Sequence, residues 1–171
     1  VMMNCYNSEA YLKEAIDSVY AQTYENWEII FWDNQSSDNS ASIAKSYDQK
    51  LKYFRAPEFT NLGKARKLAL EKVTGEYLCI LDCDDKWMPE KLQVQIDIME
   101  NDKAIALCYS QYINYFEETK KTKIAFLDSP SGYVFKEMLS NYSIGVLTTM
   151  IRFDVVKKNN LTFDENILYA N

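Results

Sequence analysis

A short apolar segment, Tyr77 to Leu81, constrains the fold of this chain more than any other feature of the sequence. It has no polar alternation, whereas a strand with one face in water alternates apolar and polar side chains. Strands that are apolar on both faces are typical of the middle of a parallel sheet covered by helices. The segment ends at Asp82. We therefore predict a central strand with acidic side chains at its carboxyl end.

Strand and helix patterns alternate through the first half of the chain. We expect strands at residues 1–5, 27–32, 52–55 and 77–81, and helices from Ser8, around 43–47, at 61–73 and from Pro89 to about Glu100. Ser8 is the expected N-cap of the first helix, whose apolar residues recur at spacings of three and four from Leu12 to Val19. This order predicts right-handed crossovers and a doubly wound α/β sheet.

The pattern changes after Lys103. We expect strands at 104–114 and 124–126 on either side of a charged turn at 117–123, then a helix at 133–139 and a strand at 146–153. A chain of 171 residues can bury a real core without disulfides. We predict a single α/β domain, residues 1–171, with a mostly parallel sheet flanked by helices and a few antiparallel strands in its second half.

Polar side chains follow three of the expected strands. The first strand ends in Asn4-Cys5-Tyr6-Asn7, the second in Asp33-Asn34 and the central one in Asp82-Cys83-Asp84-Asp85. In a doubly wound sheet, ligands bind at the carboxyl ends of the strands. The three polar clusters are therefore predicted to converge on one binding edge.

The carboxylates of Asp82, Asp84 and Asp85 would repel one another at a strand end. Left alone, at least one of them would have a raised pKa. A divalent cation removes that conflict, and magnesium binds one or two carboxylates together with substrate phosphates. The alternative is a solvent-exposed turn in which Asp85 caps the helix near Pro89. The position after a buried strand favours the metal site.

The sequence contains no histidine, which excludes Ser-His-Asp and Cys-His nucleophile systems and imidazole metal ligands. Proton transfer must therefore fall to carboxylates, and a metal site must be built from oxygen. The four cysteines form no CxxC pair and are expected to be reduced core residues. The net charge of −6 argues against general nucleic-acid binding.

With only four glycines, neither the dinucleotide fingerprint nor the P-loop can be written on this chain. A nucleotide would be held by a metal and by side chains. Arg66 lies on the apolar side of its helix, where it needs a diphosphate or an aspartate as partner or must reach solvent. Asp33 either caps a loop or accepts a hydrogen bond from a base. Tyr6 and Trp87 either stack on ligand rings or pack in the core.

Several short motifs occur in an order that covers essentially the whole chain. They are Met3 to Glu9, Ala21 to Tyr24, Trp32 to Asp38, Asn61 to Gly63 with Ala65-Arg66, Gly75 to Trp87 and Pro89 to Leu92. Together they resemble the family 2 glycosyltransferases of GT-A fold. No single motif is specific to that family, but the occurrence of all of them in the same order and alignment is.

The resemblance implies an inverting transfer of a sugar from a nucleotide donor, commonly a UDP-sugar, assisted by Mn²⁺ or Mg²⁺. Residues 1–102 would form the nucleotide-sugar-binding half and residues 103–171 an incomplete acceptor-side half. The acceptor would be a carbohydrate or a lipid-linked sugar, as in bacterial surface polysaccharide or lipopolysaccharide synthesis. The expected location is the cytoplasm, at or near the inner face of the membrane.

The resemblance also assigns site residues. Asp84 and Asp82 match the metal-binding DxD motif, with Asp82 nearer the ribose. The nucleotide-binding positions are Cys5, Tyr6, Asn7, Glu9, Asp33, Arg66, Asp82 and Cys83. Tyr6 and its neighbours match the loop under the base, and Asp33 the carboxylate that reads it.

This sequence departs from the family pattern at three places. Asn34 replaces a frequent second aspartate, and Gln35 replaces a usual glycine. Residues 163–171 resemble the lead-in to the acidic pair that supplies the catalytic base, so the base is expected beyond Asn171. Asp164 and Glu165 are candidates within the chain. The chain also begins inside an expected strand, so we expect it to be truncated at both ends and to transfer poorly.

Two other functions fit some of the same residues. One is an aspartyl phosphotransferase with Asp82 as nucleophile and Asp84 as acid–base, although Lys86 stands where Thr or Val is usual. The other is a nucleotide-sugar-binding module without transfer activity. No apolar run approaches the roughly 20 residues that span a bilayer, so membrane association would be peripheral.

Overall fold

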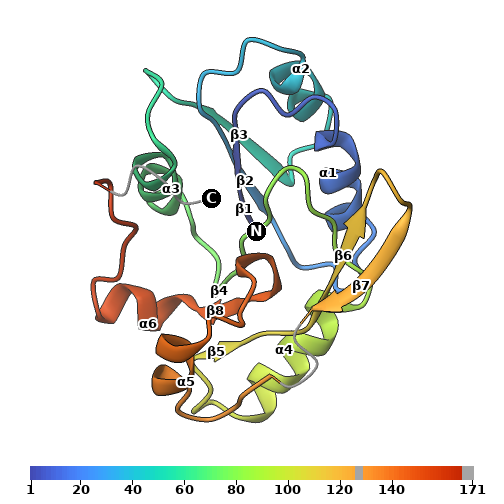
Figure 1. Ribbon diagram of the computed structural model, residues 1–171. Helices are drawn as coiled ribbons and strands as arrows, with labels where there is room; N and C mark the ends of the chain where they lie inside the picture. The colour runs from blue at the N-terminus through green and yellow to red at the C-terminus, as the bar shows by residue number, and fades with distance from the viewer. Residues whose placement is uncertain (126–128, 167–171) are drawn as a thin grey trace.

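The structure, a computed structural model, describes residues 1–125 and 129–166 (Figure 1). Its first half comprises β1 (Met2–Cys5), α1 (Leu12–Tyr20), β2 (Ile29–Asp33), α2 (Ser40–Lys45), β3 (Leu51–Arg55), α3 (Leu62–Leu70), β4 (Tyr77–Leu78) and α4 (Lys91–Asn101). Strands β1, β2 and β3 form a parallel sheet in that order. Figure 1 shows α1 and α2 on one side of this sheet and α3 on the other. The predicted α/β fold is confirmed.

The predicted central strand is buried, and it connects two sheets. β4 pairs antiparallel with β8 (Met150–Arg152). The chain just beyond β4 pairs in parallel with β1, where the Met2 amide donates to the Cys79 carbonyl at 2.8 Å and the Leu81 amide donates to the Met2 carbonyl at 3.1 Å. The expectation of parallel neighbours is therefore wrong on one side, because β8 returns from the second half in the opposite direction.

Side chains of the central strand and of β1 point alternately to the two faces of the sheet. Met3 and Leu81 belong to the core beneath α1. Met2 and Ile80 belong to the core on the other face, with Ala65 of α3. This alternation explains why the segment needs apolar residues at every position.

The second half differs more from its sequence pattern. It comprises β5 (Leu107–Cys108), β6 (Tyr112–Phe116), β7 (Lys121–Ala125), α5 (Phe135–Ser140), a 3₁₀ turn (Val146–Thr148), β8 and α6 (Phe153–Lys158). The strand predicted at 104–114 is two strands. Of the strand predicted at 146–153, only β8 is a strand, and the turn and the start of α6 take its two ends. Helix α6 was not predicted; it buries Phe153 and Val156 against the α3 face. Phe126, the end of another predicted strand, lies outside the described residues.

Helix α1 begins at Leu12, not at Ser8, because the loop after β2 holds the preceding residues. The Ser8 amide donates to Ser40 Oγ at 2.9 Å, and the Glu9 amide donates to the Asp38 carboxylate at 2.9 Å. The Ser8 hydroxyl donates to the Tyr6 carbonyl at 3.3 Å. The prediction of Ser8 as N-cap is therefore wrong.

Two other helix boundaries were predicted more closely. Helix α3 starts where expected, since Asn61 Oδ1 accepts a hydrogen bond from the Lys64 amide at 2.9 Å, as an N-cap does. It ends at Leu70, three residues early. Helix α4 begins two residues after Pro89.

Over residues 1–125 and 129–166, no helix has the length and apolar character needed to cross a membrane.

Candidate functional site

An open cleft of about 400 Å³ lies at the carboxyl ends of β1 and the central strand. It is lined by Asn4, Tyr6, Asn7, Ser8, Ala10, Tyr11, Asp82, Cys83 and Asp84. Two of the three predicted polar clusters therefore meet, as expected from the parallel register. The third belongs to the same edge, because Asp33 is the register partner of Cys5. Asp33 itself is fully buried.

Asp82 is ion-paired with Arg66, whose Nη2 donates to its carboxylate at 2.7 Å. The arginine side chain is only 12% exposed and the aspartate 34%. Of the alternatives considered for Arg66, a diphosphate, an aspartate of the cluster or solvent, the structure shows the aspartate. In the part of the chain that the structure describes, buried Arg66 Nε has no hydrogen-bond partner. One N–H of the guanidinium thus remains unused beside the cleft.

Asp84 and Asp85 complete the acidic cluster. Asp84 is exposed in the cleft. Burial, and then the charges of Asp84 and Asp82, raise the pKa of Asp85 to about 6. The predicted repulsion is therefore present. Helix α4 has Glu90 at its N-cap position, so Asp85 does not take the capping role of the alternative interpretation.

The donor set fits a hard cation that also binds phosphates. Within the described ranges, no group of three or more His, Cys, Asp or Glu side chains is arranged to hold a metal by itself. Magnesium and similar ions need only one or two carboxylates when phosphate oxygens supply other ligands. Asp84 in the cleft, with Asp82 two residues before it, provides that number.

Asp33 organises the loop that follows β2. Its Oδ1 accepts the Ser36 amide at 2.7 Å, and its Oδ2 accepts the Tyr53 hydroxyl and Arg55 Nη1, the latter at 3.1 Å. These contacts correspond to the loop-capping interpretation. Its role as a reader of the base stays a prediction.

The two departures at residues 34 and 35 have structural consequences. Asn34 Nδ2 donates to the Thr60 carbonyl at 2.7 Å, and Asn34 Oδ1 accepts the Thr60 backbone amide at 3.2 Å. These bonds tie the loop after β2 to the start of α3. Gln35 has φ 70°, in the left-handed region that favours glycine. Its side chain is held by the Ala56 carbonyl and by Arg55.

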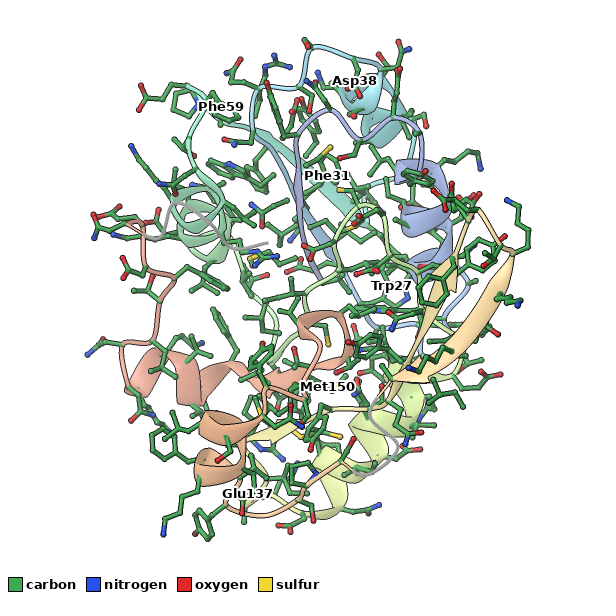
Figure 2. The ribbon with its side chains drawn as sticks, in the orientation of Figure 1. Trp27, Phe31, Asp38, Phe59, Glu137 and Met150 are labelled. Carbon is green, nitrogen blue, oxygen red and sulfur yellow. The ribbon has the colours of Figure 1, made fainter. Side chains whose placement is uncertain are left out.

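Tyr6 and Phe59 form an exposed aromatic pair at the upper end of the molecule. Their ring centroids are 4.6 Å apart, and they are 51% and 58% exposed. Phe59, labelled in Figure 2, was not predicted, because nothing near it in the sequence marks it. Trp87 is buried, and its Nε1 donates to the Leu147 carbonyl at 2.9 Å. Trp87 is therefore a packing residue.

Asn7 and Glu9 bind the neighbouring loop. Asn7, with φ 49°, accepts the Ser37 amide on its Oδ1 at 2.8 Å. Glu9 Oε2 accepts the Asn39 amide at 2.9 Å, just before α2. These contacts hold the loops after β1 and β2 together. Contact of either residue with a nucleotide stays a prediction.

Cys5 and Cys83 belong to the same buried core cluster, and Cys83 also lines the cleft. All four cysteines are free thiols. A hydrogen bond from Cys83 lowers the pKa of the Cys5 thiol to about 6, and the same contact raises the pKa of Cys83. Cys83 Sγ also donates to the Asn4 carbonyl at 3.2 Å. The Ser36 hydroxyl lies 3.8 Å from Cys5 Sγ.

Asp164 and Glu165 pack on the first turn of α3 and are not among the residues that line the cleft. A Cβ on Gly63 would lie 2.1 Å from the Asp164 carbonyl oxygen, so this close approach requires glycine. Asn61 Nδ2 donates to the Glu165 carbonyl at 2.8 Å, and Lys67 is ion-paired with its carboxylate at 3.4 Å.

Asn4 is a site residue that was placed in a polar cluster but not singled out. It lines the cleft, and among the described residues neither atom of its buried side-chain amide finds a partner. It neighbours Trp32 in register, and the Trp32 indole N–H is likewise without a partner there. The sequence did contain a signal for Asn4 as a site residue, since it is a polar residue directly before Cys5 on an otherwise apolar strand.

The chain is similar to known proteins in both sequence and structure. Residues 1–159 match the model of Glycosyl transferase family 2. TuaG of Bacillus subtilis (strain 168), named as a glycosyltransferase of teichuronic acid biosynthesis, is 30% identical over 154 residues, covering 88% of this chain and 60% of TuaG. WfgD of Escherichia coli, a UDP-Glc:alpha-D-GlcNAc-diphosphoundecaprenol beta-1,3-glucosyltransferase, is 30% identical over 152 residues, covering 88% of this chain and 58% of WfgD. The chain thus spans about three fifths of these relatives.

Solved structures share the fold. TarS 1–349 of S. aureus superposes with a TM-score of 0.76 at 22% identity, over 99% of this chain and 51% of that one. TarS has also been solved with UDP and with UDP-GlcNAc. The mannosyltransferase PcManGT from Pyrobaculum calidifontis, solved with GDP-Man and Mn²⁺, gives a TM-score of 0.70 at 16% identity, over 97% and 47% of the two chains. At these identities the likeness concerns the fold, which is that of GT-A enzymes.

Proposed function

Because the chain belongs to the family 2 glycosyltransferases, we propose that it forms the nucleotide-sugar site of an enzyme that transfers a sugar to a hydroxyl acceptor with inversion. We assign the donor to residues 1–102 and the acceptor side to residues 103–171. The preferred donor is a UDP-sugar, bound with Mn²⁺ or Mg²⁺. The observation that carries this proposal is the Arg66–Asp82 ion pair beside exposed Asp84 in the cleft.

The charges in the cleft suit a diphosphate and a cation together. Asp84 and Asp82 would hold the cation, which when bound offsets the negative charge that grows on the departing diphosphate. Arg66 Nη2 is paired with Asp82, and among the described residues its buried Nε has no partner. The guanidinium therefore supplies positive charge beside the proposed diphosphate. Burial, and then the charges of Asp84 and Asp82, raise the pKa of Asp85, and a cation would offset those two charges.

The base and ribose would lie toward the ends of β1 and β2. The exposed rings of Tyr6 and Phe59 offer a surface on which a base can stack. At the same edge, neither the donor nor the acceptor of the buried Asn4 side-chain amide has a partner among the described residues. Cys83 lines the cleft and Cys5 is buried in the core. Asn7, Glu9 and Asp33 hold the surrounding loops in place.

The acceptor hydroxyl needs a general base. Asp164 and Glu165 are positioned on α3 by the contacts of Gly63, Asn61 and Lys67 and are not cleft-lining residues. We therefore assign the base to neither residue and expect this chain to bind donor while transferring poorly. Normal turnover in a transfer assay with this chain would contradict that assignment.

The names of the relatives support a proposal for the donor and the acceptor. WfgD is named for a UDP-Glc donor and a diphosphoundecaprenol-linked acceptor, and TuaG for teichuronic acid biosynthesis. We propose a lipid-linked or polysaccharide acceptor of this kind, reached at the inner face of the membrane. PcManGT was solved with GDP-Man, so GDP-sugars are the competing donors.

The two alternative functions, a phosphotransferase and a binding module, are not equally supported. Because the chain belongs to the family 2 glycosyltransferases, an aspartyl phosphotransferase activity is not needed to explain its acidic cluster. Asp82, the nucleophile of that alternative, is already paired with Arg66. A binding module without transfer activity remains the second candidate, favoured by the positions of Asp164 and Glu165 outside the cleft lining.

A thermal-shift screen tests the proposal. The protein is melted with UDP, GDP and ADP and with their sugars, each with Mn²⁺ and with EDTA. We expect the melting temperature to rise most for UDP or a UDP-sugar, and only with Mn²⁺. The proposal fails if no nucleotide raises the melting temperature in the presence of Mn²⁺.

A further inference from the structure

Three neighbouring strand ends place Trp32, Asn4 and Asp82 in one row across the sheet. Asn4 is the register partner of Trp32 on β2. Met2 pairs in parallel with Ile80, and two further residues along each strand lead to Asn4 and Asp82. Side chains in register on parallel strands point to the same face, and Trp32, Met2 and Ile80 belong to the core on the α3 face. The row therefore faces α3 at the carboxyl edge of the sheet.

This row contains buried polar atoms that lack a hydrogen-bond partner. Over residues 1–125 and 129–166, such side-chain atoms belong to Asn4, Trp32 and Arg66. Both amide atoms of Asn4 and the Trp32 indole N–H are among them. Arg66 adjoins the row through its ion pair with Asp82. Because an unpaired buried polar group costs free energy, its repeated occurrence at one edge of the cleft indicates a place for a ligand.

The unpaired atoms of Asn4 select the chemistry of that ligand. The side-chain amide offers N–H donors on Nδ2 and lone pairs on Oδ1. A phosphate oxygen only accepts hydrogen bonds, and a metal ion binds only lone pairs, so either would leave half of the amide without a partner. A hydroxyl group both donates and accepts. The hydroxyls of a sugar ring can therefore pair with both amide atoms of Asn4.

We propose that Asn4 and Trp32 form a subsite for a sugar-ring hydroxyl of the bound nucleotide. Asn4 lines the open cleft and meets the hydroxyl as donor and acceptor, while Trp32, which is 5% exposed, supplies its indole N–H from behind. Adjacent strands lie about 4.8 Å apart, so a group bound between the two side chains is within reach of both. This inference rests on the proposed function, because the ribose or the transferred sugar of a nucleotide-sugar would supply the hydroxyl.

A cycle that changes both ligand and protein tests the subsite. UDP, 2′-deoxy-UDP, 3′-deoxy-UDP and UDP-glucose are titrated with Mn²⁺ into wild type and Asn4→Ala, and circular dichroism checks folding. In wild type, removal of the recognised hydroxyl should weaken binding about tenfold, since a neutral hydrogen bond is worth about 3- to 10-fold in affinity. In Asn4→Ala, the ligands with and without that hydroxyl should bind equally.

The four ligands distinguish the source of the hydroxyl. If it belongs to the ribose, one of the deoxy analogues shows this coupling to Asn4. If it belongs to the transferred sugar, the deoxy analogues bind as UDP does, and UDP-glucose binds more tightly than UDP in wild type but not in Asn4→Ala. Either result supports the subsite.

Trp32→Phe provides a second variant, because it keeps an aromatic ring and removes the indole N–H. It should weaken binding of the ligand that carries the hydroxyl about threefold and leave binding of the ligand without it unchanged. This variant decides the matter if Asn4→Ala does not fold. Trp27→Phe is the control, since Trp27 contacts Tyr20 of α1 on the other face of the sheet (Figure 2). It should bind all four ligands as wild type does.

The results that overturn the subsite are distinct from those that overturn the proposed function. If Asn4→Ala weakens all four ligands by the same factor, or weakens none, the subsite fails, because a role in packing or in holding a water does not depend on a ligand hydroxyl. The proposed function stands in that case if wild type binds UDP with Mn²⁺. If wild type does not bind UDP, the proposed function fails and the subsite fails with it.

Discussion

At the scale of single residues, the exposed pair Tyr6 and Phe59 allows ligand binding to be changed with little change in stability. The two rings come from the loops after β1 and β3 and contact each other at 4.6 Å between centroids. Since about half of each side chain is in solvent, neither ring contributes much to the core. Such rings are available to a planar ligand, as the proposed function requires.

We expect Tyr6→Ala and Phe59→Ala each to weaken UDP binding by about 1–3 kcal/mol, the range for stacking of a base on an aromatic ring. The melting temperature without ligand should stay close to that of wild type. Tyr133→Ala serves as control, because Tyr133 is fully exposed. Calorimetry that finds equal UDP affinity in all four proteins would show that the rings do not hold the base.

Asp85 gives a prediction about pH in the metal-free protein. Its pKa is raised from 3.8 to about 6, so between these values the folded state binds more protons than the unfolded state. Stability should therefore fall as pH rises through this window. The shift corresponds to at most about 3 kcal/mol, and solvent screening of this half-buried group reduces it to roughly 1 kcal/mol.

Asp85→Asn should accordingly be more stable than wild type by roughly 1 kcal/mol at pH 7.5 in EDTA and by less at about pH 4.5. Urea unfolding at both values measures this difference. Asp97→Asn, at an exposed position of α4, should show neither effect. If the difference in free energy of unfolding between Asp85→Asn and wild type were the same at the two pH values, the account would be refuted.

At the scale of elements, Arg152 of β8 connects three other segments of the chain. It is 9% exposed, and its guanidinium donates to the carbonyls of Ile105, Met99 and Asp102 and to the Tyr77 hydroxyl. These bonds join β8 to β4, to the end of α4 and to the chain before β5. Sequence patterns gave no sign of this role, because the partners are backbone oxygens from distant segments.

We expect Arg152→Met to lower the free energy of unfolding by about 2–3 kcal/mol, because it leaves several buried carbonyls without a donor. Lys158→Met is the control, since Lys158 forms only a surface ion pair with Asp154, worth at most about 1 kcal/mol. Both values come from urea titration followed by circular dichroism. Equal losses in the two variants would show that the bonds of Arg152 are not stabilising.

Local patterns predicted some elements well and others poorly. The burial of Leu78 to Leu81 and the position of Arg66 followed from periodicity and polarity, which belong to the segment itself. The short strand β8 and helix α6 did not, because β8 owes its existence to pairing with β4 and β5. The start of α1 was misplaced because contacts with Asp38 and Ser40 outweigh the local capping tendency of Ser8.

At the scale of the whole molecule, the fold brings Asn4 to Asn7 and Asp82 to Asp84 to one edge of the sheet. That convergence was predictable, since it depends only on strand order and direction. The hydrogen-bond partners of Asp33, Asn34 and Glu9 were not, because they depend on how the loops fold against one another. The sequence therefore predicts the position of the site well. It predicts poorly which polar atoms in the site are left without a hydrogen-bond partner.

The central claim is that Asp84 and Asp82 hold a cation against the diphosphate of a bound nucleotide. Isothermal titration of UDP with Mn²⁺ and with EDTA, in wild type, Asp84→Asn and the control Asp97→Asn, tests it most directly. We predict that Mn²⁺ raises UDP affinity at least tenfold in wild type and in Asp97→Asn, and that Asp84→Asn removes this gain. The same Mn²⁺-dependent gain in Asp84→Asn would contradict the claim.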